Sequence, residues 1–349
     1  MSTSIVQKVS SIAAKDRVFF TVVHQGTIDG ISVRSGLRIV QSFESGHFVP
    51  LSLKALSAED ARNYVGKGVA DGLEAGGVVL SMTSAKVRRA KLDDVITVKG
   101  WNDRDVPLRV TRIVEDRQAL DSELLVSVET AQTLGVDRPQ SVILWGFPKR
   151  RAAIVNALRK AVGTPGQVLD SWSPPTIDAT MSQARTKAMA GEFTLHRVNG
   201  DVVIDSEWKL THLATIAIPQ LGNITCNKKM TAAVENSFKQ IAEAGLDTNI
   251  DFDDTKRWGG CFNVREIRTA SGTSGRNLSR HSWALAIDVN PTTNAYGDVP
   301  TLDRCVVDIF RSNGFAWGGT FTVPDGMHFE YTGPPRQTQI PTCVKDSQG

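Results

Sequence analysis

The chain has 349 residues, which is enough for two domains that each bury a core of their own. It is 41% hydrophobic and 22% charged, as in ordinary globular proteins, and no apolar run is long enough to span a bilayer. A net charge of +3, without basic runs interleaved with aromatic residues, argues against a nucleic-acid partner. Residues 1–23 lack the basic start, apolar core and small-residue cleavage site of a signal peptide.

The first part of the chain, residues 1–163, is predicted to form an independent α/β or small β-rich domain. Apolar and β-branched runs between turn signals predict strands of a small sheet or barrel at residues 18–23, 36–43, 78–82, 95–98, 107–114, 123–128 and 141–144. Helices are predicted at 58–73, with Ser57 as a candidate N-cap, at 150–162 and, more briefly, at 129–134. The histidines and carboxylates here have no spacing typical of a metal site, so we expect a structural or binding role.

Two stretches rich in Gly, Pro and Ser, residues 163–166 and 171–175, predict a linker over residues 164–191. A second domain is predicted over residues 192–333, followed by an extended tail at 334–349. In and before this domain we expect a hairpin at Asn199-Gly200, strands at 214–219, 285–289 and 327–331, and helices at 176–191, 231–244 and 302–312.

The four cysteines are Cys226, Cys261, Cys305 and Cys343, and no two of them form a C-x-x-C pair. This spacing argues against a structural zinc knuckle. Cys305 lies in an apolar helical stretch and is predicted to be a buried thiol. Cys226 and Cys261 lie in turn-like segments and could form a disulfide, which would imply an oxidising compartment. Four free thiols are the alternative, and the even number of cysteines does not decide between them.

Residues 279–290 contain the strongest chemical signal in the sequence. At their end, apolar side chains alternate with small or polar ones, which places Asp288 on the polar face of a strand that follows His281. A second strand, at 327–331, places His328 opposite its apolar side chains. If the two strands are neighbours, His281, Asp288 and His328 can converge. Two imidazoles and a carboxylate suit zinc, with a fourth position open.

Each of these residues alone has a simpler explanation. His281 fits a solvated loop histidine, His328 a hydrogen-bonded core histidine, and Asp288 a carboxylate that stabilises a turn. Asp325, three residues before His328 in a Pro-Asp-Gly turn, makes the combination more informative. Its carboxylate would lie beside a metal rather than on it, where it could accept a proton from water and pass it to a leaving amine.

The stretch SRHSWALAID, residues 279–288, is similar to the S-x-H-x-x-G-x-A-x-D signature of the M15 peptidases. This family includes D-alanyl-D-alanine carboxypeptidases and L-alanyl-D-glutamate endopeptidases. The stretch DGMHFE, residues 325–330, resembles their D/E-x-x-H-F motif. The resemblance covers about residues 216–331. It implies an α+β fold in which a small antiparallel sheet with flanking helices carries one zinc ion, bound by His281, Asp288 and His328, with Asp325 as general base and acid.

Residues 259–265 also look like the stretch of this family that precedes the signature and carries an arginine. The resemblance implies that Arg265 binds the substrate carboxylate or the oxyanion, which suits a permanently charged fork of donors. Arg268 is a rival, and a surface salt bridge is the alternative role. One position departs from the signature, because its glycine is Ala284 here. If that position needs a positive φ, the alanine costs stability or reshapes the cleft.

The resemblance implies a zinc peptidase that acts on the peptide stems of bacterial peptidoglycan. An aspartate at the base position favours the L-Ala–D-Glu endopeptidases, while a D-Ala–D-Ala carboxypeptidase and a non-catalytic cell-wall-binding protein are the alternatives. Such an enzyme would act outside the membrane, at the cell wall. The missing signal peptide then fits a phage-type lysin, or a chain given without its export segment or membrane anchor.

Residues 78–144 resemble the extracytoplasmic core domain of MacB-type ABC transporter permeases, through soft patterns that contain no catalytic residue. This resemblance implies an interaction module outside the cytoplasm. Its partner would be a membrane-anchored or other protein.

Overall fold

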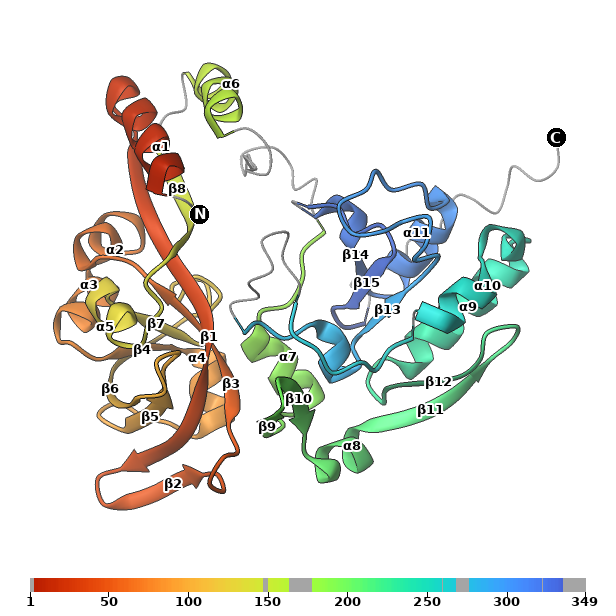
Figure 1. The fold of residues 1–349 in the computed structure, drawn as a ribbon, viewed down its shortest axis with the longest axis horizontal. Coiled ribbons are helices and arrows are strands. Elements are labelled where there is room, and N and C mark those ends of the chain that lie inside the picture. Colours follow the sequence, from red (N-terminus) through yellow and green to blue (C-terminus); the bar gives the residue numbers. More distant parts are fainter. Residues whose placement is uncertain are drawn as a thin grey trace.

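The computed structural model describes residues 3–146, 150–162, 178–258, 260–267, 276–321 and 323–334, and it mixes helices with strands (Figure 1). An N-terminal domain is separate from the part that carries the metal-ligand candidates, as the sequence predicts. None of the helices in these described ranges combines the length and the apolar character needed to cross a membrane.

An eight-stranded sheet forms the N-terminal domain. Its strands are β1 (Phe19–Ser35), β2 (Arg38–Ser42), β3 (Val49–Ala55), β4 (Val78–Ser81), β5 (Val95–Lys99), β6 (Asp105–Val114), β7 (Leu124–Val126) and β8 (Pro139–Trp145). Neighbours follow the order β1-β3-β7-β4-β6-β5, and β5 pairs back with β1, so six strands close into a ring. The predicted small β-structure is therefore a barrel. Strand β1 is long enough to pair with β8 at one end and with β2 at the other.

The helices of this domain are α1 (Thr3–Asp16), α2 (Ala58–Tyr64), α3 (Lys67–Glu74), α4 (Met82–Arg88), α5 (Val128–Thr133) and α6 (Arg151–Val162). The prediction of one helix at 58–73 is wrong, because the chain breaks at Gly66, where φ is 137°. Ser57 is confirmed as the N-cap, since its hydroxyl accepts a hydrogen bond from the Asp60 amide at 3.0 Å.

The elements between the two regions are α7 (Gln183–Ala190), β9 (Leu195–Val198), β10 (Asp201–Ile204), α8 (Ser206–His212), β11 (Leu213–Ile218), β12 (Gly222–Asn227), α9 (Thr231–Glu243), η1 (Asp247–Asn249) and α10 (Phe252–Trp258). The predicted hairpin at Asn199-Gly200 joins β9 to β10. Half of the predicted linker, residues 164–177, and nearly all of the predicted tail lie outside the described residues. The domain limits of 163, 191 and 333 remain predictions.

A three-stranded antiparallel sheet lies at the centre of the C-terminal region. It consists of β13 (Ala286–Asp288), β15 (His328–Tyr331) and β14 (Phe315–Trp317), in that order, and is accompanied by η2 (Arg280–Trp283), η3 (Gly318–Thr320) and α11 (Arg304–Ser312). Phe310 of α11 stacks on Phe329 of β15 with ring centroids 4.4 Å apart, and both are fully buried. The predicted small antiparallel sheet with flanking helices is confirmed.

A buried charge cluster joins α7 to the barrel. Lys187 Nζ lies 2.9 Å from carboxylate oxygens of both Glu123 and Glu192, and Arg88 pairs with the same two carboxylates. Burial of Glu192 opposes its ionised form, but Arg88 and Lys187 outweigh that effect and lower its pKa to about 2. Since buried charges are tolerated only when they are paired, the cluster fixes α7 to the barrel in one arrangement.

Candidate metal centre

A short 3-10 turn, η2, positions His281. The Ser279 hydroxyl accepts a hydrogen bond from the His281 amide at 3.3 Å, and the turn ends at Ala284, which has a left-handed backbone with φ 52°. Asn227 of β12 supports this end, because its amide donates to the Ala284 carbonyl at 2.9 Å. A left-handed alanine is strained by about 1 kcal/mol, which explains why the signature has glycine there.

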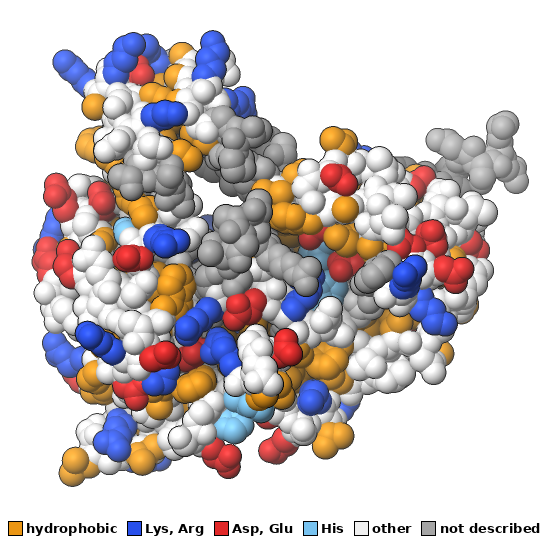
Figure 2. Space-filling model, in the orientation of Figure 1, with side chains coloured by type: hydrophobic (Ala, Val, Ile, Leu, Met, Phe, Trp, Pro, Cys, Tyr) orange, Lys and Arg blue, Asp and Glu red, His pale blue; other side chains and the backbone are white. Residues whose placement is uncertain are grey.

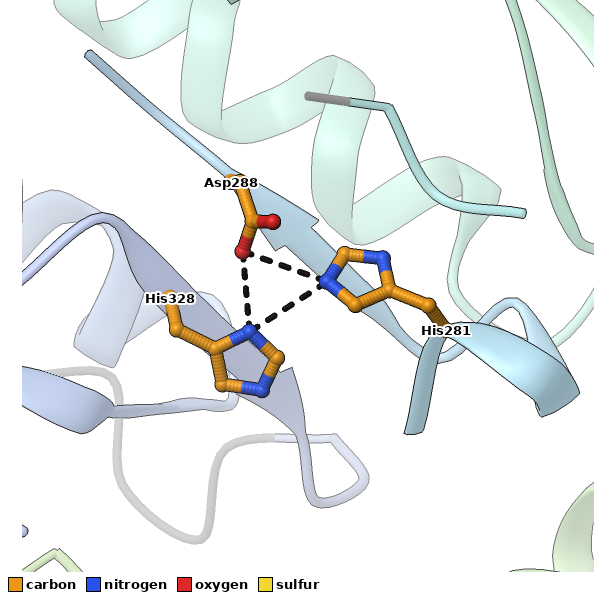
Figure 3. Close-up of side chains that lie close together, drawn as sticks. All are labelled: His281, Asp288 and His328. Carbon is orange, nitrogen blue, oxygen red and sulfur yellow. Dashed lines mark hydrogen bonds and ion pairs between the residues drawn. The ribbon is translucent and has the colours of Figure 1, made fainter. Parts of the chain in front are cut away.

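The register of two strands brings the other candidates to His281. Asp288 of β13 lies directly opposite His328 of β15, so the two side chains share one face. Asp288 Oδ1 is 2.9 Å from His328 Nδ1 and 3.1 Å from His281 Nε2, and the two nitrogens are 3.3 Å apart (Figure 3). All three side chains are buried, and together they could hold a metal ion.

This donor triangle has the dimensions that zinc requires. Bonds of about 2.0–2.1 Å in a tetrahedron place ligand atoms roughly 3.3 Å apart, close to the edges of 2.9–3.3 Å found here. The remaining ring nitrogens are also occupied: His281 Nδ1 donates to the Cys261 carbonyl at 3.3 Å, and His328 Nε2 faces Glu330 Oε1 at 3.4 Å. These partners leave the two inward nitrogens free to act as lone-pair donors, so the residues fit zinc.

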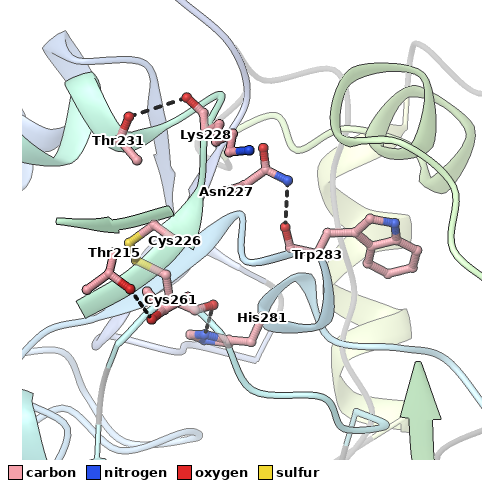
Figure 4. Close-up of a disulfide and its surroundings, with 9 residues drawn as sticks. Thr215, Cys226, Asn227, Lys228, Thr231, Cys261, His281 and Trp283 are labelled. Atoms are coloured by element: carbon pink, nitrogen blue, oxygen red, sulfur yellow. Dashed lines mark hydrogen bonds between the residues drawn. A yellow bond between two sulfur atoms is a disulfide. The ribbon is translucent and has the colours of Figure 1, made fainter. Parts of the chain in front are cut away.

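A disulfide between Cys226 and Cys261 fixes the carbonyl that meets His281 (Figure 4). It ties β12 to the segment before η2. Of the two alternatives that the sequence left open for these cysteines, the disulfide is the one present. Cys305 is also disulfide-bonded, so the prediction of a buried thiol is wrong. The apolar spacing around Cys305 correctly indicated a helix but contained no information about the bonded state of its sulfur.

The metal-free centre is held together by strong charge coupling. Burial opposes ionisation of Asp288, but His281 and His328 outweigh this and hold the pKa of that carboxyl far below its usual range. Burial equally opposes protonation of His328, yet its hydrogen bonds to Asp288 and Glu330 raise its pKa to about 10. A proton on His328 thus supplies the positive charge that a metal ion would supply at the same place.

Asp325 lies beside this triangle without being part of it. Its amide donates to the Gly318 carbonyl at 2.9 Å, and its buried Oδ1 has no hydrogen-bond partner among the described residues. Burial raises the pKa of this carboxyl, His328 and Arg265 lower it, and Asp288 raises it further. An unpartnered carboxylate with a raised pKa next to the donor triangle is suited to accepting a proton.

Arg265 is held against η2 by its backbone. Its amide donates to the Ser282 hydroxyl at 3.1 Å, and its carbonyl accepts from the Ser279 amide at 3.0 Å. The charge of its guanidinium acts on Asp325, as the pKa of that carboxyl shows. The rival arginine, Arg268, lies outside the described residues.

Three residues near the centre were not singled out by the sequence. Glu330 lies two positions after His328 on β15, a spacing that places both on one face and could have indicated the contact. Arg280 is near Glu330, with Nε 3.6 Å from Oε2. Tyr296 forms a β-bridge with Asp325 and is 46% exposed. Nothing in the sequence places this loop tyrosine beside Asp325, because the bridge joins distant segments.

Comparison with known proteins gives one family match. Residues 272–331 match an M15 peptidase family model described as D-alanyl-D-alanine carboxypeptidase. The matched segment contains His281, Asp288, Asp325 and His328 but not Arg265. The resemblance of residues 78–144 to MacB-type permeases is not supported, and no curated protein matches the chain. The match supports an M15 peptidase of the D-alanyl-D-alanine carboxypeptidase-like kind, with a His–Asp–His site that could bind a metal.

Proposed function

We propose that this protein is a zinc-dependent peptidase that hydrolyses the peptide stems of bacterial peptidoglycan at the L-Ala–D-Glu bond. One observation carries the proposal. His281, Asp288 and His328 form a buried donor triangle of zinc dimensions, with Asp325 beside it, inside the segment that matches the M15 peptidase model. A structural zinc site is closed by its ligands, so it does not require a carboxylate such as Asp325, whose Oδ1 has no hydrogen-bond partner among the described residues.

Zinc bound by the three residues would supply a Lewis acid for the scissile carbonyl and would make a water molecule acidic. Asp325 accepts the proton of the attacking water and delivers it to the amine as the peptide bond breaks. Its raised pKa makes the carboxylate a stronger base than an exposed aspartate. Arg265 binds the substrate carboxylate or the oxyanion of the tetrahedral intermediate.

The choice of bond depends on the length of the base. Asp325 is one methylene shorter than the glutamate typical of the D-Ala–D-Ala carboxypeptidases, which favours the endopeptidase. Carboxypeptidase activity is the second candidate, because the matched family model carries that description. Digestion of a purified stem pentapeptide, followed by mass spectrometry of the products, separates the two. Release of L-Ala from the rest of the stem supports the endopeptidase, and loss of a single C-terminal alanine supports the carboxypeptidase.

We place the enzyme outside the cytoplasm, at the cell wall, where its substrate lies. The disulfide between Cys226 and Cys261 and the bonded state of Cys305 support this placement, because disulfides persist in oxidising compartments. Mass measurement of the protein from its native source, with and without reduction before alkylation, tests it. Free thiols in the native protein would contradict an oxidising location.

A further inference from the structure

A concentration of positive charge lies at helices α1 and α6, outside the metal centre. Residues 3–18 and 150–162 contain seven Lys or Arg against one Asp, while the rest of the chain contains 33 Lys or Arg against 36 Asp or Glu. Figure 2 shows Lys and Arg gathered at the top of the molecule, where Figure 1 places these helices. We call α1, Arg17, Arg150 and α6 the basic helix pair.

The two helices pack together through their apolar sides and expose their cations. They leave from the paired ends of β1 and β8, where Phe19 lies opposite Trp145. Their buried contact consists of Val9, Ala13, Ile154 and Leu158, with Val18 at the base. The exposed cations are Lys8, Lys15, Arg17, Arg150, Arg159 and Lys160. Asp16, the one carboxylate of the pair, already lies 2.6 Å from Arg150.

Helix electrostatics explain only part of this pattern. Lys15, Arg159 and Lys160 are in the last turns of their helices, where cations stabilise the helix dipole. Arg17 directly follows the last residue of α1 and is favoured in the same way, whereas Lys8, in the middle of the helix, is not explained by it. In addition, neither helix has an acidic residue in its first turn, where dipole stabilisation would favour one. Clustered cations that no helix dipole accounts for give the surface a positive potential, which attracts an anionic partner.

We propose that the basic helix pair binds a flexible anionic polymer with repeated phosphate groups. The described part of the pair exposes no large apolar side chain, which a helix needs in order to enter a bilayer. Neither α1 nor α6 contains an aromatic residue, and the exposed Phe19, stacked on Trp145, lies only at their base. The faces of the two helices therefore offer single-stranded nucleic acid no stacking platform. Arginine forks, as at Arg17 and Arg159, match phosphate oxygens in pairs. We therefore take as the partner a hydrated phosphate polymer, which needs neither apolar insertion nor aromatic stacking.

The test uses the full chain with long-chain inorganic polyphosphate as the probe. One variant combines Lys8→Gln, Arg17→Gln, Arg159→Gln and Lys160→Gln, all exposed and outside the apolar contact. A matched control with the same net charge combines Arg38→Gln, Arg104→Gln, Arg117→Gln and Arg138→Gln on the barrel. At low salt the first variant is expected to bind several hundredfold more weakly, at roughly fivefold per cation, while the control stays near wild type.

Binding of wild type should also weaken steeply as salt rises, with a shallower dependence in the helix-pair variant. An equal loss in both variants, or no binding by wild type, overturns the proposal. Tighter binding to duplex DNA, or to vesicles of phosphatidylglycerol and phosphatidylcholine in equal parts, overturns the choice of partner. If circular dichroism shows that the fourfold variant does not fold, the double variants Lys8→Gln/Arg17→Gln and Arg159→Gln/Lys160→Gln are each expected to lose roughly 25-fold. None of these readouts depends on zinc or on hydrolysis.

Discussion

His328 and Glu330 lie on one face of β15, and their contact determines which nitrogen of His328 faces the donor triangle. His328 Nε2 is 3.4 Å from Glu330 Oε1, while Nδ1 is 2.9 Å from Asp288 Oδ1. Burial opposes ionisation of Glu330, but Arg280 and His328 keep its pKa below the usual range. Glu330 is therefore an anion that receives the outer N–H of His328 and orients the ring toward a metal.

Replacement of Glu330 should weaken zinc binding, and the loss should be larger when both its negative charge and its hydrogen-bond acceptor are removed. Glu330→Gln keeps an acceptor but loses the charge, and Glu330→Ala loses both. Within the 10–100-fold range typical of such contacts, we expect the larger loss of affinity for alanine. Competition with a chelator measures the affinity, and the visible spectrum of the cobalt form reports ligand geometry. Glu243→Gln, on the exposed end of α9, is the matched control. Equal zinc affinity in all variants would remove this role from Glu330.

Variants of Asp325 and of His281 should distinguish a loss of catalysis from a loss of metal binding. Asp325→Ala is expected to keep one zinc per chain and to lose about 10²–10⁴-fold in kcat, because the proton acceptor is gone while the donor triangle stays. His281→Ala should lose both zinc and activity. Elemental analysis beside stem-peptide hydrolysis gives both readouts. Zinc lost from Asp325→Ala would make Asp325 a ligand. If the wild-type protein contains no stoichiometric zinc and His281→Ala changes neither zinc content nor hydrolysis, the result would instead favour a non-catalytic wall-binding protein.

The protonation of His328 predicts a pH dependence of the metal-free protein. Its pKa rises from 6.5 to about 10 on folding, so the stabilisation it gives is complete below about pH 6.5 and is lost as pH rises through about 10. With chelator present, the free energy of unfolding should therefore fall over this range. Zinc affinity should rise over the same range, because zinc displaces a proton. Thermal unfolding and chelator competition are each measured across this pH range for wild type and for His328→Gln. The difference between the two proteins is the contribution of His328. The same pH dependence in His328→Gln would assign it to other groups.

The disulfide should support both stability and the site. Cys226 and Cys261 are 35 residues apart, and removing such a crosslink costs about 3–4 kcal/mol in the chain-entropy account. The double variant Cys226→Ala/Cys261→Ala should therefore unfold at lower temperature. It should also bind zinc more weakly, because the Cys261 carbonyl that orients His281 is no longer fixed. Calorimetry and zinc competition measure the two effects. Unchanged zinc affinity in a destabilised protein would limit the disulfide to a structural role.

Local pattern was sufficient for much of the fold and for the identity of the candidate ligands. Alternation indicated the strands that carry Asp288 and His328, and turn chemistry indicated the hairpin at Asn199-Gly200 and the cap at Ser57. Helix α1 was missed because its Ser and β-branched residues have low helix propensity, and packing against α6 stabilises it instead. Strand β3 was missed because it contains Pro50, and a proline normally argues against a central strand.

The sequence alone determined which residues could bind a metal, because residue type and alternation depend only on near neighbours along the chain. Tertiary structure decided that β13 lies next to β15 in the register that pairs Asp288 with His328, and that β5 closes the barrel on β1. It also decided that Asp325 Oδ1 has no hydrogen-bond partner among the described residues, and that Glu330 and the Cys261 carbonyl contact the outer nitrogens. These features join segments tens of residues apart. Their free energy comes from burial and pairing that exist only once the whole chain has folded.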